Sequence, residues 1–254
     1  MTNLAGRSIR SSIWNTLSQG LQVLILLARS IILARLLSPE VFGIYAFAQS
    51  IVHITIILPS FGLGSAYIHR APETEHPDAT GVYFTLITIF TLLWAVLLTI
   101  LGWLLLENDR FIVLFSLVIA TFFTQLVTPA RSILKKQVQF QRLALLDLVV
   151  TIITTIIAVA LAWHQNDVWS LICIDLSRAA ILVVGLYFMD PVWKPRLVWS
   201  SRIVGYFIKF GSTTLFAGLL SRALDRLDDM WTGWSLGDNA LGFYSRAYAF
   251  ANYP

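Results

Sequence analysis

Long apolar stretches separated by short polar segments recur along the whole chain. A helix that crosses a bilayer needs about 20 mostly apolar residues, and residues 83–106 contain no charged side chain. Helices are expected because an open sheet cannot satisfy its backbone hydrogen bonds in lipid. The second stretch contains Pro59, Gly62 and Gly64, which predict a kink there. The pattern predicts seven transmembrane helices, at residues 13–37, 41–68, 81–106, 111–130, 143–163, 168–189 and 206–236.

The composition of the chain supports a membrane protein. Hydrophobic residues make up 57% of the sequence and charged residues only 13%, whereas a typical soluble domain has about 25% charged residues. We therefore predict an all-α polytopic membrane fold, with no segment that has the character of a soluble domain.

Basic residues are distributed unevenly between the two sides of the predicted membrane. The N-terminal segment and the second, fourth and sixth loops together hold 11 of the 18 lysines and arginines. Loops on the cytoplasmic side of a membrane are enriched in Lys and Arg. The charge pattern therefore predicts a multi-pass protein of the cytoplasmic (inner) membrane with its N-terminus in the cytoplasm.

A short internal repeat indicates how the chain is organised. The segment Leu37–Tyr45 follows the first predicted helix, and Leu236–Tyr244 follows the seventh; they match at the leucine, glycine and tyrosine positions. Six helices separate the copies, so both copies have the same orientation, as in transporters built from parallel repeats. Chance similarity is the alternative. The repeat predicts a six-helix lobe at residues 1–203 and the beginning of a second, unfinished lobe at residues 204–254.

Polar residues form a stripe on the first predicted helix. At 100° per residue the four side chains fall within an arc of about 80°, and ionisable groups at membrane depth usually face a cavity or a partner. We expect this stripe to bind substrate, with the arginine lining an aqueous cavity. Helix–helix hydrogen bonds are the alternative for the amides. The four residues are Asn15, Gln19, Gln22 and Arg29.

The seventh predicted helix carries a cluster of ionisable residues. Its candidate substrate-binding residues are Arg222, Asp225, Arg226 and Asp228, and Asp229 follows them. In the alignment of the two copies, Asp228 occupies the position equivalent to Arg29. Two alternatives remain open: the cluster can neutralise itself through ion pairs along the helix, or Arg29 can pair with Asp228 to hold the lobes together. In the sixth helix we expect Asp175 and Arg178 to form an ion pair.

Other chemistry has little support in the sequence. Cys173 is the single cysteine, the four histidines are scattered, and neither a catalytic nor a nucleotide-binding motif is present. We therefore expect no cofactor, no metal, no nucleic-acid partner and no enzymatic activity. Residues 131–142 are basic with Leu134 and Phe140 interleaved, so we expect them to form an interfacial helix against anionic membrane lipids.

Four segments resemble the oligosaccharide (O-antigen, Wzx-like) flippases and polysaccharide biosynthesis transporters of the multidrug/oligosaccharidyl-lipid/polysaccharide exporter (MOP) superfamily. Each segment is loose alone, but together they occur in order along the chain. The resemblance implies the N-terminal half of a protein with two six-helix lobes around a central cavity. The segments are LARLLSPEVFG at residues 33–43, FGLGSAYIHR at 61–70, LKKQVQF at 134–140 and LGFYSRAY at 241–248.

The resemblance also implies a function. Members of this family move undecaprenyl-diphosphate-linked oligosaccharides across the membrane by alternating access, for lipopolysaccharide O-antigen and other polysaccharides, and polysaccharide-assembly proteins are possible partners. The first helix is also similar to that of the related lipid II flippases, in which the arginine matching Arg29 lines the cavity. Val23 and Ile56 stand where other cavity arginines of that group would be placed.

Two competing functions remain. A drug/cation antiporter of the same superfamily would need an acidic and aromatic site, which Arg29 disfavours. A membrane prenyl- or glycosyltransferase could use Asp225, Asp228 and Asp229 to hold Mg²⁺ for a diphosphate substrate. The interleaved arginines neutralise that cluster, and the sequence contains no second Asp-rich motif.

Overall fold

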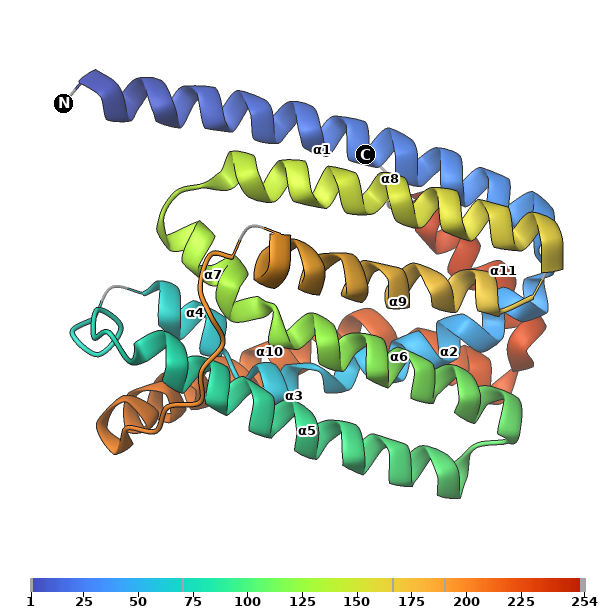
Figure 1. The fold of residues 1–254 in the computed structure, drawn as a ribbon. Coiled ribbons are helices and arrows are strands. Elements are labelled where there is room, and N and C mark those ends of the chain that lie inside the picture. Colours follow the sequence, from blue (N-terminus) through green and yellow to red (C-terminus); the bar gives the residue numbers. More distant parts are fainter. Residues whose placement is uncertain (1, 70, 166, 190, 252–254) are drawn as a thin grey trace.

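The computed structural model of the protein describes residues 2–69, 71–165, 167–189 and 191–251 (Figure 1). The side chains of residues 2–17, 214, 216–219, 222, 223 and 225 lie outside this description. The described residues form helices and no strands, which confirms the predicted all-α fold. The helices are α1 (Thr2–Leu36), α2 (Pro39–Thr55), α3 (Ile57–Ser60), α4 (Leu63–Ile68), α5 (Ala79–Leu105), α6 (Asn108–Leu126), α7 (Thr128–Lys136), α8 (Phe140–Gln165), α9 (Trp169–Val183), the π-helix η1 (Val184–Met189), α10 (Ser201–Ser235) and α11 (Gly237–Ala251).

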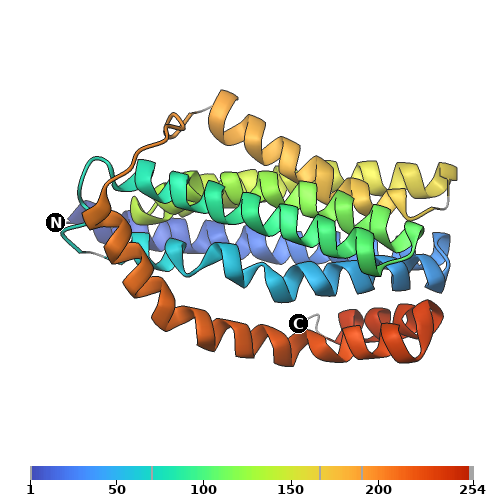
Figure 2. The same ribbon diagram turned by 90° about the horizontal axis from the view of Figure 1, so that it is seen from below.

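The long helices run roughly parallel to one another, so the bundle has two distinct ends (Figures 1 and 2). At the short-turn end, α1 joins α2, α5 joins α6, α8 joins α9 and α10 joins α11. At the basic end lie the connections at residues 71–78, 137–139 and 191–200. The charge pattern predicts that the basic end is cytoplasmic.

Six stretches of helix in the described part of the chain are long and apolar enough to cross a membrane, and they match the first six predicted spans. The seventh predicted span is one continuous helix of 35 residues, α10. Its charged residues, including Arg226, Asp228 and Asp229, keep it outside this apolar group. Its position across the membrane therefore stays a prediction.

The second span is broken where Pro59 and the glycines predicted a kink. It consists of α2, α3 and α4, and the break between α3 and α4 places Phe61 and Gly62 in the left-handed region, with φ of 40° and 62°. Helix α10 passes close to this break, since a Cβ on Gly211 would lie 2.2 Å from the Phe61 carbonyl oxygen. The kink is therefore a packing site for α10.

The basic segment 131–142 differs from its prediction. It does not form a separate interfacial helix, because its first half belongs to α7, which continues the α6 span, and Leu134 is fully buried. Arg131 pairs with Asp147 at 2.7 Å, and Lys136 pairs with Glu75 at 3.1 Å. These two cations form ion pairs that stabilise the basic end of the bundle. The sequence pattern alone could not distinguish such ion pairs from contacts with lipid headgroups.

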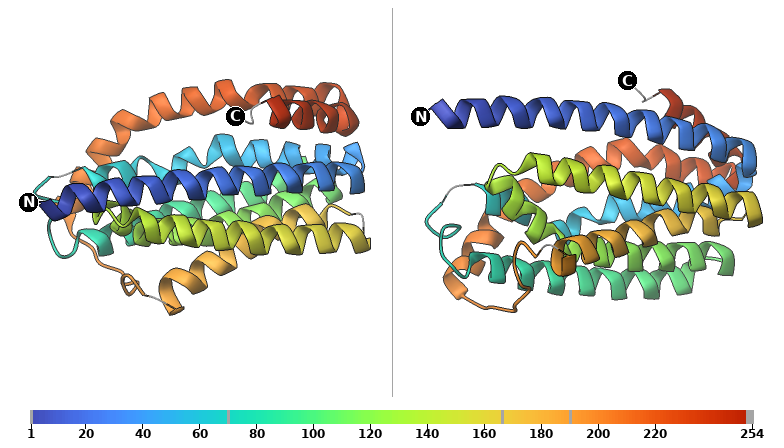
Figure 3. Two further views of the ribbon diagram at one scale, coloured as in Figure 1. Left: turned by 90° about the horizontal axis from the view of Figure 1, so that it is seen from above. Right: turned by 45° about the horizontal axis from the view of Figure 1, so that its top comes forward.

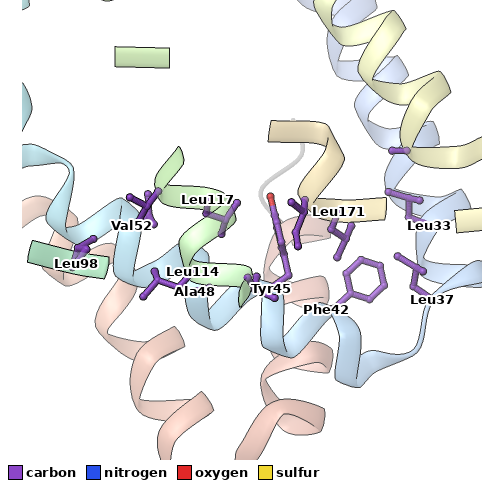
Figure 4. Close-up of a cluster of buried hydrophobic side chains, with 14 of the residues drawn as sticks. Leu33, Leu37, Phe42, Tyr45, Ala48, Val52, Leu98, Leu114, Leu117 and Leu171 are labelled. Atoms are coloured by element: carbon purple, nitrogen blue, oxygen red, sulfur yellow. The ribbon is translucent and has the colours of Figure 1, made fainter. Parts of the chain in front are cut away.

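A large apolar cluster holds the short-turn half of the bundle together. Side chains from α1, α2, α5, α6, α8 and α9 contribute to it, and Leu33, Phe42 and Leu171 lie side by side within it (Figure 4). The outer surfaces of the helices expose other apolar side chains, such as Trp103 and Leu105 on α5. Such exposure suits helices whose outer faces contact lipid.

Helices α2 and α11, which carry the two copies of the repeat, pack against each other at close range. A Cβ built on Gly43 would lie 1.8 Å from the carbonyl oxygen of Asp238, and a Cβ built on Gly242 would lie 1.8 Å from that of Pro39. The repeat offset of 199 residues relates Gly43 to Gly242 and Pro39 to Asp238. The two contacts are therefore equivalent, with the two copies exchanged. Only glycine permits such an approach at either position.

Further contacts across this interface obey the same exchange. The Arg246 guanidinium lies 4.2 Å from the centre of the Phe42 ring. Phe47 packs with Leu241 in a small buried cluster. The offset relates Phe42 to Leu241 and Phe47 to Arg246, so this pair is equivalent to the first. The two copies are therefore related by a local two-fold axis between α2 and α11, and α10 and α11 lie along one side of the bundle (Figure 3).

Candidate functional site

Polar side chains from three helices meet at one level of the membrane. Arg29 lies seven residues before the end of α1, Tyr45 six residues after the start of α2, and Asp175 six residues after the start of α9. At 1.5 Å per residue, each lies about 10 Å from the short-turn end. The three residues therefore share a layer well inside the apolar spans.

Hydrogen bonds hold the centre of this layer. The Tyr45 hydroxyl donates to Asp175 Oδ2 at 2.6 Å, and Gln49 Nε2 donates to the Tyr45 hydroxyl at 3.0 Å. Tyr45 is buried, with 7% of its surface exposed, and its hydroxyl points out of the apolar cluster (Figure 4). A short bond from a neutral donor to a carboxylate is stronger than one between neutral groups, so Tyr45 fixes the position of Asp175.

Three arginines surround this pair. Asp175 interacts electrostatically with Arg178 and Arg29, and Tyr45 interacts electrostatically with Arg29 and Arg246. We call these residues, with Gln49, the Tyr45–Asp175 cluster. A guanidinium group at membrane depth, such as that of Arg29, usually faces a cavity or a charged partner.

A second polar group lies at a similar depth on α10. Asp229, with 4% of its surface exposed, accepts hydrogen bonds from Arg226 Nη1 at 3.0 Å and from Ser50 Oγ at 3.3 Å. Asp228 accepts a hydrogen bond from the Tyr244 hydroxyl at 2.5 Å. The Arg226–Asp229 pair is an ion pair along the helix, as the spacing allowed.

The two tyrosines are counterparts in the repeat, and so are their charged neighbours. Adding 199 to Tyr45 gives Tyr244, and adding 199 to Arg29 gives Asp228. Tyr45 interacts with Arg29, and Tyr244 bonds to Asp228. The same sequence position of the repeat thus carries a cation in the first copy and an anion in the second.

The structure brings together only part of the predicted site. In the stripe on α1, Arg29 and Gln22 are half-buried and Gln19 is exposed. Arg226 and Asp228 belong to the second polar group, on α10. The described contacts of Asp228 are with Tyr244 and with its own backbone neighbour, so they do not include the Arg29–Asp228 pair that was one alternative. The side chains of three predicted residues, Asn15, Arg222 and Asp225, lie outside the described residues.

Sequence reasoning missed three members of the cluster. The sequence around Tyr45, Gln49 and Arg246 contains no motif that indicates a binding site. Asp175 was predicted only as the ion-pair partner of Arg178. One signal was available: Tyr45 is a matching position of the repeat. A repeated tyrosine beside a repeated glycine indicates a residue at the interface between the copies.

Comparison with protein families and known proteins gives a consistent result. The family model described as "Polysaccharide biosynthesis protein" matches residues 32–254. The chain is 27% identical over 237 residues to the succinoglycan biosynthesis transport protein ExoT of Rhizobium meliloti, covering 88% of this chain and 45% of that protein. It is 24% identical over 208 residues to the teichuronic acid biosynthesis protein TuaB of Bacillus subtilis, covering 78% and 42%. The chain thus spans about half the length of the curated relatives it matches.

A solved structure shows the same fold. A MOP superfamily transporter from Pyrococcus furiosus superposes with a TM-score of 0.59 and 16% sequence identity, over 96% of this chain and 59% of that one. At this identity the likeness concerns the fold alone. The match extends across nearly all of the helices described above.

Proposed function

Because this chain belongs to the polysaccharide biosynthesis protein family, as the sequence resemblance predicted, we propose that it is part of a transporter that moves a lipid-linked oligosaccharide across the cytoplasmic membrane. The relative named as a succinoglycan transport protein supports transport rather than synthesis. The fold shared with a MOP superfamily transporter supports the same choice.

The observation that carries the proposal is Arg29 at membrane depth, in electrostatic interaction with the Tyr45–Asp175 pair. Removing a guanidinium from water is costly unless charged or polar partners compensate it. A lipid diphosphate supplies such compensation, since arginine binds phosphate oxygens in a bidentate way. The undecaprenyl diphosphate group that the family resemblance implied is an anion of this kind.

The cluster also bears on the competing functions. A drug/cation antiporter needs an acidic and aromatic site, whereas Arg29, Arg178 and Arg246 interact electrostatically with the Tyr45–Asp175 pair. For a Mg²⁺-dependent transferase, Asp228 would have to bind the metal ion, but it accepts a hydrogen bond from the Tyr244 hydroxyl. Asp229, in addition, is engaged by Arg226.

The mechanism we propose is alternating access between two lobes. Residues 204–254, which contain α10 and α11, would begin the second lobe, and the glycine contact between α2 and α11 would join the lobes near the short-turn end. In this arrangement the substrate site lies beside the interface that moves. Residues 1–254 alone should then fail to restore polysaccharide export, and a chain with a complete second lobe should restore it.

Complementation of a strain that lacks its own transporter tests the role of Arg29. In the full-length protein, Arg29→Ala should insert at normal levels and lose most of its transport. Arg29→Lys should retain part of it, because lysine keeps the charge without the bidentate geometry. Arg35→Ala is the matched control: Arg35 is on the same helix, is exposed, and points to another face. It should transport normally.

The rival explanation is that Arg29 only balances the charge of Asp175. In that case Arg29→Ala combined with Asp175→Asn would restore transport, because neither charge would remain uncompensated. Our proposal predicts that the double variant stays inactive. Wild-type transport by a well-expressed Arg29→Ala protein would show that the substrate-binding role is wrong.

The proposed orientation has its own test. A reporter that is active only in the cytoplasm should be active when it is fused after Gln137, at the basic end. A reporter that is active only outside the cytoplasm should be active when it is fused at Asp167, in the α8–α9 turn. The reverse pattern would overturn the predicted N-terminus in the cytoplasm.

A further inference from the structure

A groove of about 560 Å³ lies between α8 and the end of α9, away from the Tyr45–Asp175 cluster. Its walls are mostly apolar, and Arg142 is the one charged side chain among the described residues that line it. The volume falls in the range typical of small-molecule sites, about 300–1,000 Å³. The lining residues are Arg142, Leu145, Leu146, Val149, Ala180, Ile181, Val184, Gly185, Leu186 and Met189.

The groove exists because α9 changes its winding. At Val184 the α-helix becomes the π-helix η1, a form that is frequent at functional sites. Within η1, Leu186 is fully buried and the Tyr187 hydroxyl donates to the Leu126 carbonyl oxygen at 2.5 Å. These inward residues fix η1 to the α6–α7 junction, while Val184 and Met189 remain exposed along the groove.

The floor of the groove is set by a close helix contact. A Cβ on Gly185 would lie 3.0 Å from Leu146 Cδ1, so α8 and η1 approach each other at this glycine. Leu145 and Val149 on one wall are about half exposed, and so is Val184 on the other. The groove therefore offers a continuous apolar surface rather than isolated side chains.

Arg142 lies at the end of the groove nearest the basic end of the bundle. It is two residues after the start of α8 and 23 residues before its end, which is about 35 Å from the short-turn end. Asp175 lies about 9 Å from that same end. A diphosphate held by the Tyr45–Asp175 cluster therefore cannot also contact Arg142, so the groove is a separate site.

The connection that follows η1 marks the depth of the lipid headgroups. Residues 191–200 are non-helical, and Val198 faces inward, with its backbone N–H donating to Thr85 Oγ1 at 2.9 Å. Its neighbours Leu197 and Trp199 are exposed by 71% and 62%, beside the exposed Lys194. Exposed tryptophan beside basic side chains is typical of the membrane–water interface. The Arg142 end of the groove lies at this end of the bundle.

We propose that the groove binds one anionic phospholipid of the leaflet at the basic end, with an acyl chain along α8 and η1 and its phosphate at Arg142. The apolar walls suit a hydrocarbon chain, and the guanidinium suits a phosphate. An arginine has five N–H donors, so it can bind phosphate while it keeps contacts within the protein. The site is peripheral, because η1 diverges on the face of the bundle opposite α10 (Figure 3).

Photo-crosslinking in nanodiscs tests this site. The purified full-length protein is placed in phosphatidylcholine nanodiscs that contain either phosphatidylglycerol or phosphatidylcholine with a diazirine in the acyl chain, and labelled peptides are identified by mass spectrometry. We expect phosphatidylglycerol to label residues 142–149 and 180–189 roughly fivefold more than phosphatidylcholine, as one basic residue at the headgroup level would produce.

Three variants separate the contributions. Arg142→Gln should reduce phosphatidylglycerol labelling to the phosphatidylcholine level and leave phosphatidylcholine labelling unchanged, which also shows that the protein is folded. Ala180→Trp fills the groove from an exposed lining position and should reduce labelling by both lipids. Lys135→Gln removes an exposed cation at the same end of the bundle and should change neither. Equal labelling by the two lipids in the wild type, or labelling outside the groove, would overturn the proposal.

Discussion

The two copies of the repeat, Leu37–Tyr45 and Leu236–Tyr244, make the same glycine contact with each other and have different chemistry. Gly43 and Gly242 make the same contact with the opposite copy, at the same distance. Tyr45 is buried and bonds to Asp175, a residue from a third helix, whereas Tyr244 is 37% exposed and bonds to Asp228 on the neighbouring helix of its own copy. The positions that match in sequence are therefore those that determine helix packing.

The positions that differ between the copies determine the charge of the site. Arg29 in the first copy corresponds to Asp228 in the second, and Pro39 corresponds to Asp238. Since backbone contact needs small residues while a side chain in a polar layer is less constrained, the copies could keep one packing and acquire opposite charges. The polar group beside Tyr45 therefore contains a cation, Arg29, where the group beside Tyr244 contains an anion, Asp228.

The strongest test of the packing comparison is to add one carbon atom at either glycine. Gly43→Ala and Gly242→Ala each place a Cβ against a backbone carbonyl oxygen, which cannot move without shifting a helix. Each should destabilise the protein by about 3 kcal/mol, the upper part of the range for overpacking. Thermal unfolding in detergent micelles measures the effect.

The matched control for that test is Gly20→Ala on α1. Among the described residues, no atom beyond the neighbouring backbone of its own helix lies within 4 Å of a Cβ at Gly20, so this change should stabilise the helix by about 0.5–1 kcal/mol. A large effect at Gly43 with none at Gly242 would contradict the two-fold relationship between the copies.

Sequence patterns predicted the fold well because lipid imposes a simple constraint: each span needs a long apolar helix. The same patterns missed the break before α7 and the π-helix η1, which depend on contacts such as that of Tyr187 with Leu126. The repeat predicted that the two copies have the same orientation, but not that α2 and α11 pack against each other. The structure explains the repeated glycine, because small residues allow close helix contact.

The site was predicted less completely than the fold. Helical periodicity placed Arg29 on a polar face of α1, but it does not show which helix lies opposite that face. Tyr45 and Asp175 are 130 residues apart in sequence, and their hydrogen bond depends on the packing of α2 beside α9. Arg246 lies beyond the last predicted span, so no pattern connected it with Arg29.

A smaller effect is expected from the tyrosine hydroxyls, and it should differ between the copies. Tyr45→Phe leaves Asp175 without its bound donor in a buried place and should cost about 2 kcal/mol. Tyr244→Phe removes a bond at a more exposed site and should cost about 0.5 kcal/mol. Thermal unfolding of the two variants measures both costs. Equal costs would show that the two tyrosines have equivalent surroundings, against the structure.

The smallest effect concerns an ion pair that only one copy possesses. Arg110 Nη2 lies 2.7 Å from Asp238 Oδ1, with both side chains about one-fifth exposed. The counterpart of Asp238 is Pro39, which cannot form such a pair. A double-mutant cycle with Arg110→Ala and Asp238→Ala should give a coupling free energy of about 1 kcal/mol. A coupling free energy of zero would show that the pair does not join α6 to α11.

The most direct test of the account is the affinity of undecaprenyl diphosphate for the full-length protein, measured by native mass spectrometry on three forms. Arg29→Ala should weaken binding at least about tenfold relative to wild type, since a charge-assisted hydrogen bond contributes about 1.5–3 kcal/mol. Asp228→Asn, the change at the counterpart position, should leave the affinity equal or stronger. If Arg29→Ala binds as tightly as wild type, or if Asp228→Asn weakens binding as much as Arg29→Ala does, the Tyr45–Asp175 cluster is not the site for the lipid diphosphate.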